Sequence, residues 1–485
     1  MWTEYTEQIS EDAFYYEQPE RTTDVELPPG MGFLLLMIWV TICLVGFAII
    51  FFAKNTFVGI AVIALPTFFG MVIKPTFALC ILMLVLPTGA GVGYAEIFSL
   101  DRGVGIAVAA TFALNLLISR PRLRIRNKAL WVIVVYTIWI FLTSLGAPHL
   151  GLELRRAYTQ FQLLVLVFIA YWTLETNHPK TLIWVLRSYV VGTLGMIGFT
   201  YITGAEMTYV EDPTRYGMTF GRAINPNELG DITAMALLAA FYLFARDKQG
   251  LWRLIYIVAM LSLPIVILKT GARGALVALA FTMLLPLLSM RQVYRRPALA
   301  ALLVVFIVLV SVSAAFLVVK GGGLEREVSE RLTSVQYAQK SINLRVFLIK
   351  KALKAATRPT GTSFYGWEEY SGITTQPHTD FFFLLGIYGI PCAALFALFV
   401  IMIMLTVKRI PLGIEKLYAR AVLTFLLVAG LSHVRLYTKF YWVFLAVIMA
   451  SERIGQFYLS QKEFSYELEE EGYLYSENEL QGFPT

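Results

Sequence analysis

Arg273 lies in a polar turn, residues 269–274, between two apolar runs. Each run is about as long as a bilayer is thick, so the turn is predicted to lie at a membrane surface. A guanidinium at the start of the second run can bind an anionic group such as a diphosphate through paired N–H donors. The alternative is that Lys269 and Arg273 only extend to lipid headgroups. The role of Arg273 therefore depends on which other residues lie near it.

A second polar segment, residues 203–226, carries Arg215 and Arg222 among several glycines. Two arginines in a short segment can each bind phosphate oxygens through two parallel hydrogen bonds. Ordinary surface pairing with Glu211 or Asp212 is equally compatible with the sequence. The segment is therefore a second candidate for anion binding.

The longest polar segment, residues 320–377, contains a helical pattern over 324–356 in which Arg345 is one of several basic residues. A basic amphipathic helix beside a membrane is typical of an interfacial element, and a lid packed on a helical bundle is the alternative. His378 follows just before an apolar run. A neutral imidazole can accept a proton from a sugar hydroxyl, although a histidine that only ends a helix is also compatible with this position.

The other histidines show no comparable setting. His178 is predicted to be a solvated loop residue, and His149 and His433 are predicted to be structural residues near the same membrane face as His378. The acidic residues of the polar segments show no ligand spacing with histidines, and the three cysteines all lie in apolar runs. We therefore expect no metal site, no disulfide framework and no cofactor.

The composition excludes a soluble globular protein, because 58% of the 485 residues are hydrophobic and only 15% are charged. About 14 apolar runs (12–14) are each near the span of a bilayer, which predicts an all-α, polytopic transmembrane bundle with a large helical extracytoplasmic loop. The net charge of +7 is spread among short loops. It therefore reports orientation in the bilayer and not nucleic-acid binding.

The predicted organisation has five parts: an acidic, disordered cytoplasmic tail (1–30), transmembrane helices 1–11 (31–319), the extracytoplasmic loop (320–377), helices 12–14 (378–458) and a second acidic cytoplasmic tail (459–485). The densest basic cluster, residues 120–128, is placed in the cytoplasm by the positive-inside rule. Counting helices from that cluster puts both termini in the cytoplasm. The three segments that carry Arg215, Arg273 and His378 then all lie outside.

Four motifs in order make the chain resemble the O-antigen ligase and O-antigen polymerase superfamily. They are residues 215–230 (Arg-Tyr-Gly to Asn-Pro-Asn-Glu-Leu-Gly), 270–275 (Thr-Gly-Ala-Arg-Gly-Ala), 343–361 (Asn-Leu-Arg to Arg-Pro-Thr-Gly) and 378–391 (His-Thr-Asp to Gly-Ile-Pro). The resemblance covers roughly residues 205–407. Thr270 stands where many relatives carry Ser, Thr379 stands where Asn is common, and residues 359–364 are an altered form of the usual Pro-Leu-Leu-Gly-x-Gly pattern.

The resemblance implies a membrane glycosyltransferase at the outer face of the bacterial inner membrane. Members of this family take a glycan from undecaprenyl diphosphate and pass it to a hydroxyl of lipid A core, of another glycan repeat unit or of a protein. Carried over to this chain, Arg273 is the diphosphate anchor, Arg215 or its rival Arg222 a second one, Arg345 a further candidate by its setting, and His378 the base. The implied reaction is metal-independent and inverting, and proteins of envelope polysaccharide assembly are possible partners.

Two other classes remain open from the sequence. A transporter or flippase of lipid-linked saccharides would carry ionisable residues at mid-membrane and inverted repeats. A non-catalytic scaffold of an envelope assembly complex is suggested by the tyrosine-rich and glutamate-rich tails. The sequence does not distinguish ligase, polymerase and protein O-glycosyltransferase activity.

Overall fold

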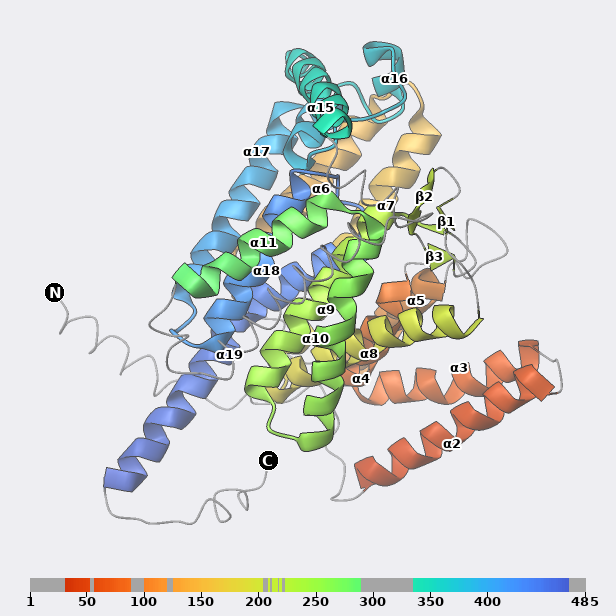
Figure 1. Ribbon diagram of the computed structural model, residues 1–485, viewed down its shortest axis with the longest axis vertical. Helices are drawn as coiled ribbons and strands as arrows, with labels where there is room; N and C mark the ends of the chain where they lie inside the picture. Colours follow the sequence, from red (N-terminus) through yellow and green to blue (C-terminus); the bar gives the residue numbers. More distant parts are fainter. Residues whose placement is uncertain are drawn as a thin grey trace.

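The computed structural model describes residues 31–52, 56–88, 100–119, 125–203, 208–209, 212–216, 218–219, 223–288 and 335–470. These residues are almost wholly helical, which confirms the all-α prediction (Figure 1). The helices are α2 (Met31–Phe52), α3 (Thr56–Ile73), α4 (Pro75–Val85), the 3-10 helix η1 (Leu86–Thr88), α5 (Leu100–Ser119), α6 (Ala129–Leu145), α7 (Leu150–Thr176), α8 (Lys180–Thr203), α9 (Pro226–Arg246), α10 (Gly250–Thr270), α11 (Arg273–Leu288), α15 (Val335–Ala355), α16 (Gly366–Ser371), α17 (Asp380–Arg409), α18 (Ile414–Gly430) and α19 (Lys439–Glu470).

Strands occur between α8 and α9. Two antiparallel pairs form there: β1 (Thr208–Tyr209) with β2 (Asp212–Tyr216), and β3 (Met218–Thr219) with β4 (Ala223–Ile224). Each pair is too short to be stable alone, so the flanking helices must position it.

Five of the described helices are long and apolar enough to cross a membrane: α7, α8 over Lys180–Ile202, α9, α10 and α17. They support a multi-pass membrane protein. Helices also occupy the other apolar runs predicted from the sequence, except the run 297–319, which lies outside the described residues. The first tail, 1–30, also lies outside them, and α19 continues to Glu470, past residue 459 where the second tail is predicted to begin. The larger number of spans stays a prediction.

Helix α9 is the most enclosed of the five candidate spans. In its most apolar 18-residue stretch, 78% of the residues are buried, whereas the value for the other four helices is 39–56%. It packs against α8, α10, α11 and α18. Four of its alanines, Ala234, Ala236, Ala239 and Ala240, are fully buried. Small side chains let neighbouring helix backbones approach closely inside a membrane, where water does not drive association. The alanine-rich sequence of α9 therefore explains its central place.

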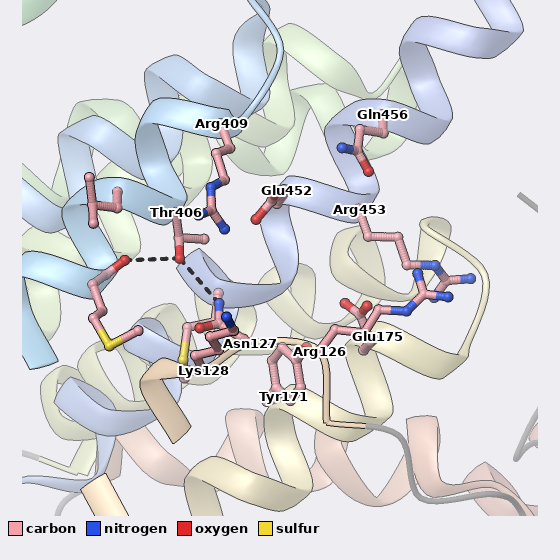
Figure 2. Close-up of a pocket in the computed structure, with 13 residues that line it drawn as sticks. Arg126, Asn127, Lys128, Tyr171, Glu175, Thr406, Arg409, Glu452, Arg453 and Gln456 are labelled. Atoms are coloured by element: carbon pink, nitrogen blue, oxygen red, sulfur yellow. Dashed lines mark hydrogen bonds between the residues drawn. The ribbon is translucent and has the colours of Figure 1, made fainter. Parts of the chain in front are cut away.

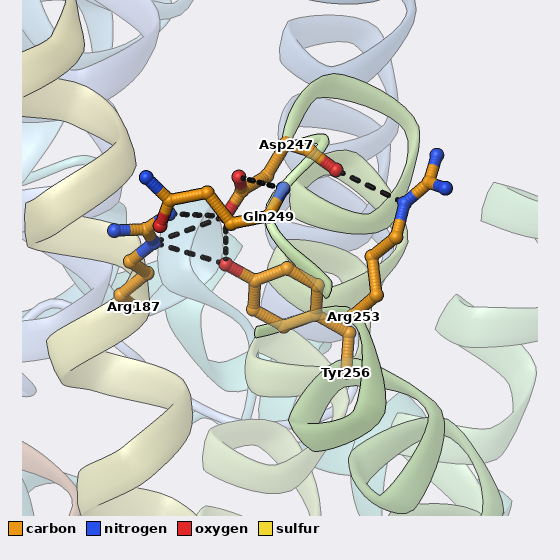
Figure 3. A network of polar contacts seen from close by, with 5 residues as sticks. All are labelled: Arg187, Asp247, Gln249, Arg253 and Tyr256. Atoms are coloured by element: carbon orange, nitrogen blue, oxygen red, sulfur yellow. Dashed lines mark hydrogen bonds and ion pairs between the residues drawn. The ribbon is translucent and has the colours of Figure 1, made fainter. Parts of the chain in front are cut away.

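Arg187 connects α8 to the turn between α9 and α10 (Figure 3). Its guanidinium makes an ion pair with Asp247 and donates from Nε to the Tyr256 hydroxyl at 3.1 Å, and that hydroxyl donates to Asp247 at 2.6 Å. The rings of Trp184 and Trp252 each have their centroid 4.4 Å from the Arg187 guanidinium carbon. A buried charge with this many partners is tolerated because its lost hydration is replaced.

Helix α17 is broken near its start. Gly389 has φ 81° and ψ 179°, a conformation that is essentially restricted to glycine. Pro391 lacks the N–H that would otherwise bond to the carbonyl of Ile387. The break therefore leaves backbone carbonyls of the preceding turn without their helical donors, and each needs another partner if it is buried.

The loop after α15 supplies these partners. The backbone N–H groups of Thr362 and Ser363 donate to the carbonyls of Gly386 and Ile387, both at 3.0 Å. The indole N–H of Trp139, on α6, donates to the carbonyl of Tyr388 at 3.0 Å. The loop segment 359–363 is thus bonded into the break of α17.

Helix α15 packs on α17, and both lie near the top of the view in Figure 1. A methyl group built at Gly386 of α17 would lie 3.0 Å from Trp367 of α16 and 3.2 Å from Ala352 of α15, so the three helices meet at that glycine. Trp367 is fully buried. Helix α15 therefore packs on the bundle through small and apolar residues that include Leu348 and Ala352, while Ile342, Val346 and Leu353 stay exposed.

Substitution of Gly389 by alanine is expected to destabilise the protein by about 1–3 kcal/mol, because alanine disfavours this backbone conformation. The added methyl group would also collide with the backbone carbonyl of Pro359. Thermal unfolding in detergent measures the effect. Gly195→Ala is the matched control, since a methyl group there meets no atom within 4 Å and alanine favours the helix. Equal stability of the two variants would show that the backbone at Gly389 does not require glycine.

Candidate functional site

The turn between α10 and α11 places Arg273 as the first residue of α11. Gly271 ends α10 with φ 59°, the left-handed conformation that glycine adopts readily. The Thr270 hydroxyl accepts a hydrogen bond from the Ala272 N–H at 3.2 Å, which stabilises the turn. A methyl group at Gly230 of α9 would lie 2.9 Å from Ala272, so the turn rests on the first turns of α9. The predicted position of Arg273 beside the start of a helix is confirmed.

The start of α11 touches the loop between α18 and α19, residues 431–438. A methyl group at Gly274 would collide with the Ser432 side chain. The next residue, His433, stacks on His378, with ring centroids 6.1 Å apart and planes inclined by 28°. This sequence of contacts places the Arg273 turn and His378 at the same end of the bundle.

Arg345, on α15, is the third predicted site residue at the end of the bundle that carries Arg273 and His378. Its positive charge is close enough to act on the ionisation of His378. Its side chain is partly buried, and its Nε finds no hydrogen-bond partner among the residues that the structure describes. Three of the predicted site residues, Arg273, Arg345 and His378, are therefore linked through His433 and Ser432 at one end of the molecule. We call this group the Arg273–His378 site.

Burial lowers the pKa of His378 below its ordinary value, and the charge of Arg345 lowers that pKa further. Since the ordinary value is about 6.5, the imidazole is neutral at pH 7. The neutral form is the one that can accept a proton. Burial also lowers the pKa of Arg345.

A buried ionic network holds the elements that carry these residues. The Arg435 guanidinium, in the loop 431–438, makes an ion pair with Asp231 of α9. The Arg435 backbone N–H donates to Asp380, at the start of α17, at 2.7 Å. The three side chains are 1%, 0% and 5% exposed, respectively. The network therefore joins α9, α17 and the loop 431–438, and two of its members, Asp380 and Arg435, lie two residues after His378 and His433, respectively.

A second cluster fixes the loop that follows α15 to α7. The Arg156 guanidinium lies 3.0 Å from the centroid of the Phe364 ring and 5.0 Å from that of Tyr437. The Glu153 carboxylate accepts a hydrogen bond from the Tyr365 N–H at 2.7 Å. Because Tyr437 belongs to the loop 431–438, the same cluster also restrains the loop that carries His433.

Two predicted site residues are not placed by these contacts. Arg215 lies in β2, but its side chain is not described, and Arg222 lies outside the described residues. Their predicted role as diphosphate-binding residues stays a prediction.

Several residues of this region were not identifiable as site residues from the sequence. His433 is predicted to be structural, yet it is the residue that stacks on His378. Asp231 is an acidic residue inside an apolar run, and that alone is a signal for a buried partner. Arg435 follows His433 in a short polar turn. Nothing in the sequence pairs it with Asp231, 204 positions earlier, because that pairing depends on how the helices pack.

Within the described part of the chain, no group of three or more histidine, cysteine or acidic side chains could hold a metal ion. No protein-family model matches the chain, and no curated protein matches it either. The residues and their geometry therefore carry the functional argument.

Replacing Arg345 by methionine is expected to raise the pKa of His378, because one of the two causes that lower it is removed. Burial, the larger cause, remains, so the pKa should stay below about 6.5. NMR titration of labelled histidine measures it, with His378→Gln to assign the signal. Lys350→Met, an exposed change on the same helix, is the control. An unchanged or lowered pKa in Arg345→Met would contradict the proximity of the two side chains.

Asp231→Asn should lower the free energy of unfolding by about 3–5 kcal/mol, because it leaves a buried guanidinium without its counter-charge. The double variant Asp231→Leu/Arg435→Met should lose less, since neither charge then remains buried. Thermal unfolding in a fixed detergent compares the three proteins. A double variant that is less stable than Asp231→Asn would show that the ion pair itself is not the dominant interaction.

Proposed function

We propose that the protein is a membrane glycosyltransferase that moves a glycan from a polyprenyl diphosphate carrier, of the undecaprenyl type, to an acceptor hydroxyl. The observation that carries the proposal is the Arg273–His378 site, in which two arginine residues and one neutral imidazole lie at the same end of an apolar helical bundle. The motif resemblance to O-antigen ligases and polymerases agrees with it. Lipid A core, another glycan or a protein is the acceptor.

The chemistry follows from these groups. The acceptor oxygen attacks the anomeric carbon while the bond from that carbon to the diphosphate oxygen breaks, which inverts the anomeric centre. His378 takes the proton of the acceptor hydroxyl. Arg273 and Arg345 bind the leaving diphosphate, whose negative charge grows as the bond breaks. The guanidinium groups supply the positive charge that the leaving group needs, so no step of this mechanism calls for a metal ion.

Helix α15 fits a substrate that is anchored in lipid. It packs on α17 through buried residues that include Leu348 and Ala352. Its opposite side exposes large apolar side chains beside Arg345, namely Ile342, Val346, Phe347 and Leu353. An amphipathic helix with exposed apolar and basic residues lies naturally at a membrane interface. That placement brings Arg345 to the depth of a lipid diphosphate.

A flippase or transporter is the second class left open by the sequence. Its coupling residues are expected near the bilayer midplane. The buried Asp231 lies only five residues after the start of α9, about 8 Å along the helix. It is therefore near one end of the span. The position of Asp231 therefore favours a role at the end of the bundle that carries the Arg273–His378 site over a role as a coupling residue at mid-membrane.

Substitution of Arg273 tests the proposal. Arg273→Ala should lower the rate of glycan transfer on the order of a hundredfold, which corresponds to about 3 kcal/mol of lost transition-state stabilisation. Arg273→Lys should also be slow, because lysine cannot form the paired hydrogen bonds. Transfer from an undecaprenyl-diphosphate-linked oligosaccharide in proteoliposomes is the measurement. Lys269→Gln, which removes a charge from the same turn, is the control.

His378→Ala, measured in the same assay, separates enzyme from scaffold. We expect a loss of about 10²–10⁴-fold in rate with an unchanged amount of folded protein. A scaffold protein would show no transfer activity in the unmodified protein, and a flippase would move the donor across the bilayer without forming a new glycosidic bond. Normal transfer by well-folded Arg273→Ala and His378→Ala would refute the proposed function.

A further inference from the structure

A polar cavity of about 230 Å³ lies at the opposite end of the helices that form the Arg273–His378 site (Figure 2). Asp380 begins α17 beside that site, and Thr406 of the same helix lines the cavity. The 26 residues between them correspond to about 40 Å of helix, which exceeds the thickness of the hydrocarbon core. The cavity therefore belongs to the other face of the protein, where the basic cluster 120–128 predicts the cytoplasm. We call it the inner pocket.

The inner pocket is lined by an unusual number of charged side chains. They come from the segment before α6, from the ends of α7 and α17 and from the middle of α19, and they are Arg126, Lys128, Glu175, Arg409, Glu452 and Arg453. Figure 2 shows them around one space, with Thr406 and Asn127 between them. Basic side chains that gather at a membrane face are available to bind anionic groups.

The segment that carries two of the cations is fixed in place. The side-chain amide nitrogen of Asn127 donates a hydrogen bond to the Thr406 hydroxyl of α17 at 3.2 Å. The side-chain oxygen of Asn127 accepts a hydrogen bond from the Ala129 N–H at 3.0 Å. These two bonds hold the backbone between Arg126 and Lys128 against the wall of the pocket. The backbone that carries the two cations is therefore held beside the pocket, which limits the chain ordering that binding requires.

The charges of the inner pocket do not balance. Four cations and two carboxylates leave a formal excess of two positive charges. Glu175 lies within electrostatic range of Arg126 and Arg453, and Glu452 within range of Arg409. The carboxylates thus offset the arginines only in part. The excess suits a ligand with about two negative charges, such as a phosphate group.

The volume of the inner pocket and its hydrogen-bond donors further restrict the class of ligand that it can bind. A cavity of about 230 Å³ is smaller than the roughly 300–1,000 Å³ of pockets that enclose drug-sized ligands. Guanidinium groups bind phosphate oxygens through paired donors, and lysine binds them as a point charge. Basic pockets between transmembrane helices at a cytoplasmic face suit phosphate-bearing headgroups.

We propose that the inner pocket binds a phosphate group, at a site separate from the Arg273–His378 site. The group belongs either to the headgroup of an anionic membrane lipid or to a free phosphate compound. The proposal does not depend on the glycosyltransferase function. Arg126 and Lys128 contact the phosphate from the open side of the pocket, where both side chains are exposed.

Binding to the purified full-length protein distinguishes the two sources. In one arm, native mass spectrometry counts the phosphatidylglycerol retained from nanodiscs that contain phosphatidylcholine and phosphatidylglycerol. In the other, inorganic pyrophosphate is titrated into protein in nanodiscs of phosphatidylcholine alone, and thermal stability reports binding. Arg126→Gln/Lys128→Gln should weaken binding of the retained probe by about tenfold or more, since each charge-assisted contact contributes substantially. Glu452→Gln should strengthen it, because the pocket then carries one more net positive charge.

Lys350→Gln/Lys354→Gln, which removes two exposed lysines of α15, is the matched control and should bind like the unmodified protein. Retained phosphatidylglycerol that falls only in the Arg126→Gln/Lys128→Gln protein supports a lipid headgroup. Stabilisation by pyrophosphate that falls only in that protein supports a free phosphate compound. Equal binding by both double variants, or no binding of either probe to the unmodified protein, would overturn the proposal.

Discussion

The ion pair between Asp231 and Arg435 is the constraint on which the candidate site depends. Each charge is buried among apolar helices, where a charge without its partner would be strongly destabilising. Arg435 can meet Asp231 only when the loop 431–438 lies over the start of α9, and its backbone simultaneously holds Asp380. The places of His433 and His378 follow from this arrangement, because both lie within two residues of a member of the network. The network thus positions the histidines of the candidate site.

The sequence predicted the helices well because hydropathy acts locally. Apolar runs of bilayer length need their backbone hydrogen bonds satisfied within the segment, and a helix does this wherever the run occurs. The turn at 269–274 was also predictable, since Gly271 provides a left-handed residue and Arg273 follows it. In both cases the information lies within a few residues of the feature.

Features that depend on distant residues were not predictable. The stack of His378 on His433 requires the starts of α17 and α19 to lie together, and no local pattern specifies that contact. The apolar run of α17 reads as one helix, because the residues on both sides of Gly389 are equally hydrophobic. Gly389 followed by Pro391 was a signal for a break, but the partners at Thr362 and Ser363 come from a separate loop.

The bonding of residues 359–363 into α17 also decides where foreign sequence can be inserted between α15 and α17. A tag placed within 359–363 would have to displace backbone groups that complete a membrane helix, and would leave carbonyls exposed to an apolar environment. The turn at Gly372 is different, because it is exposed and a side chain there meets no neighbouring atom within 4 Å. An epitope or fluorophore therefore belongs at that turn, nine residues after Ser363, where the bonded segment 359–363 ends.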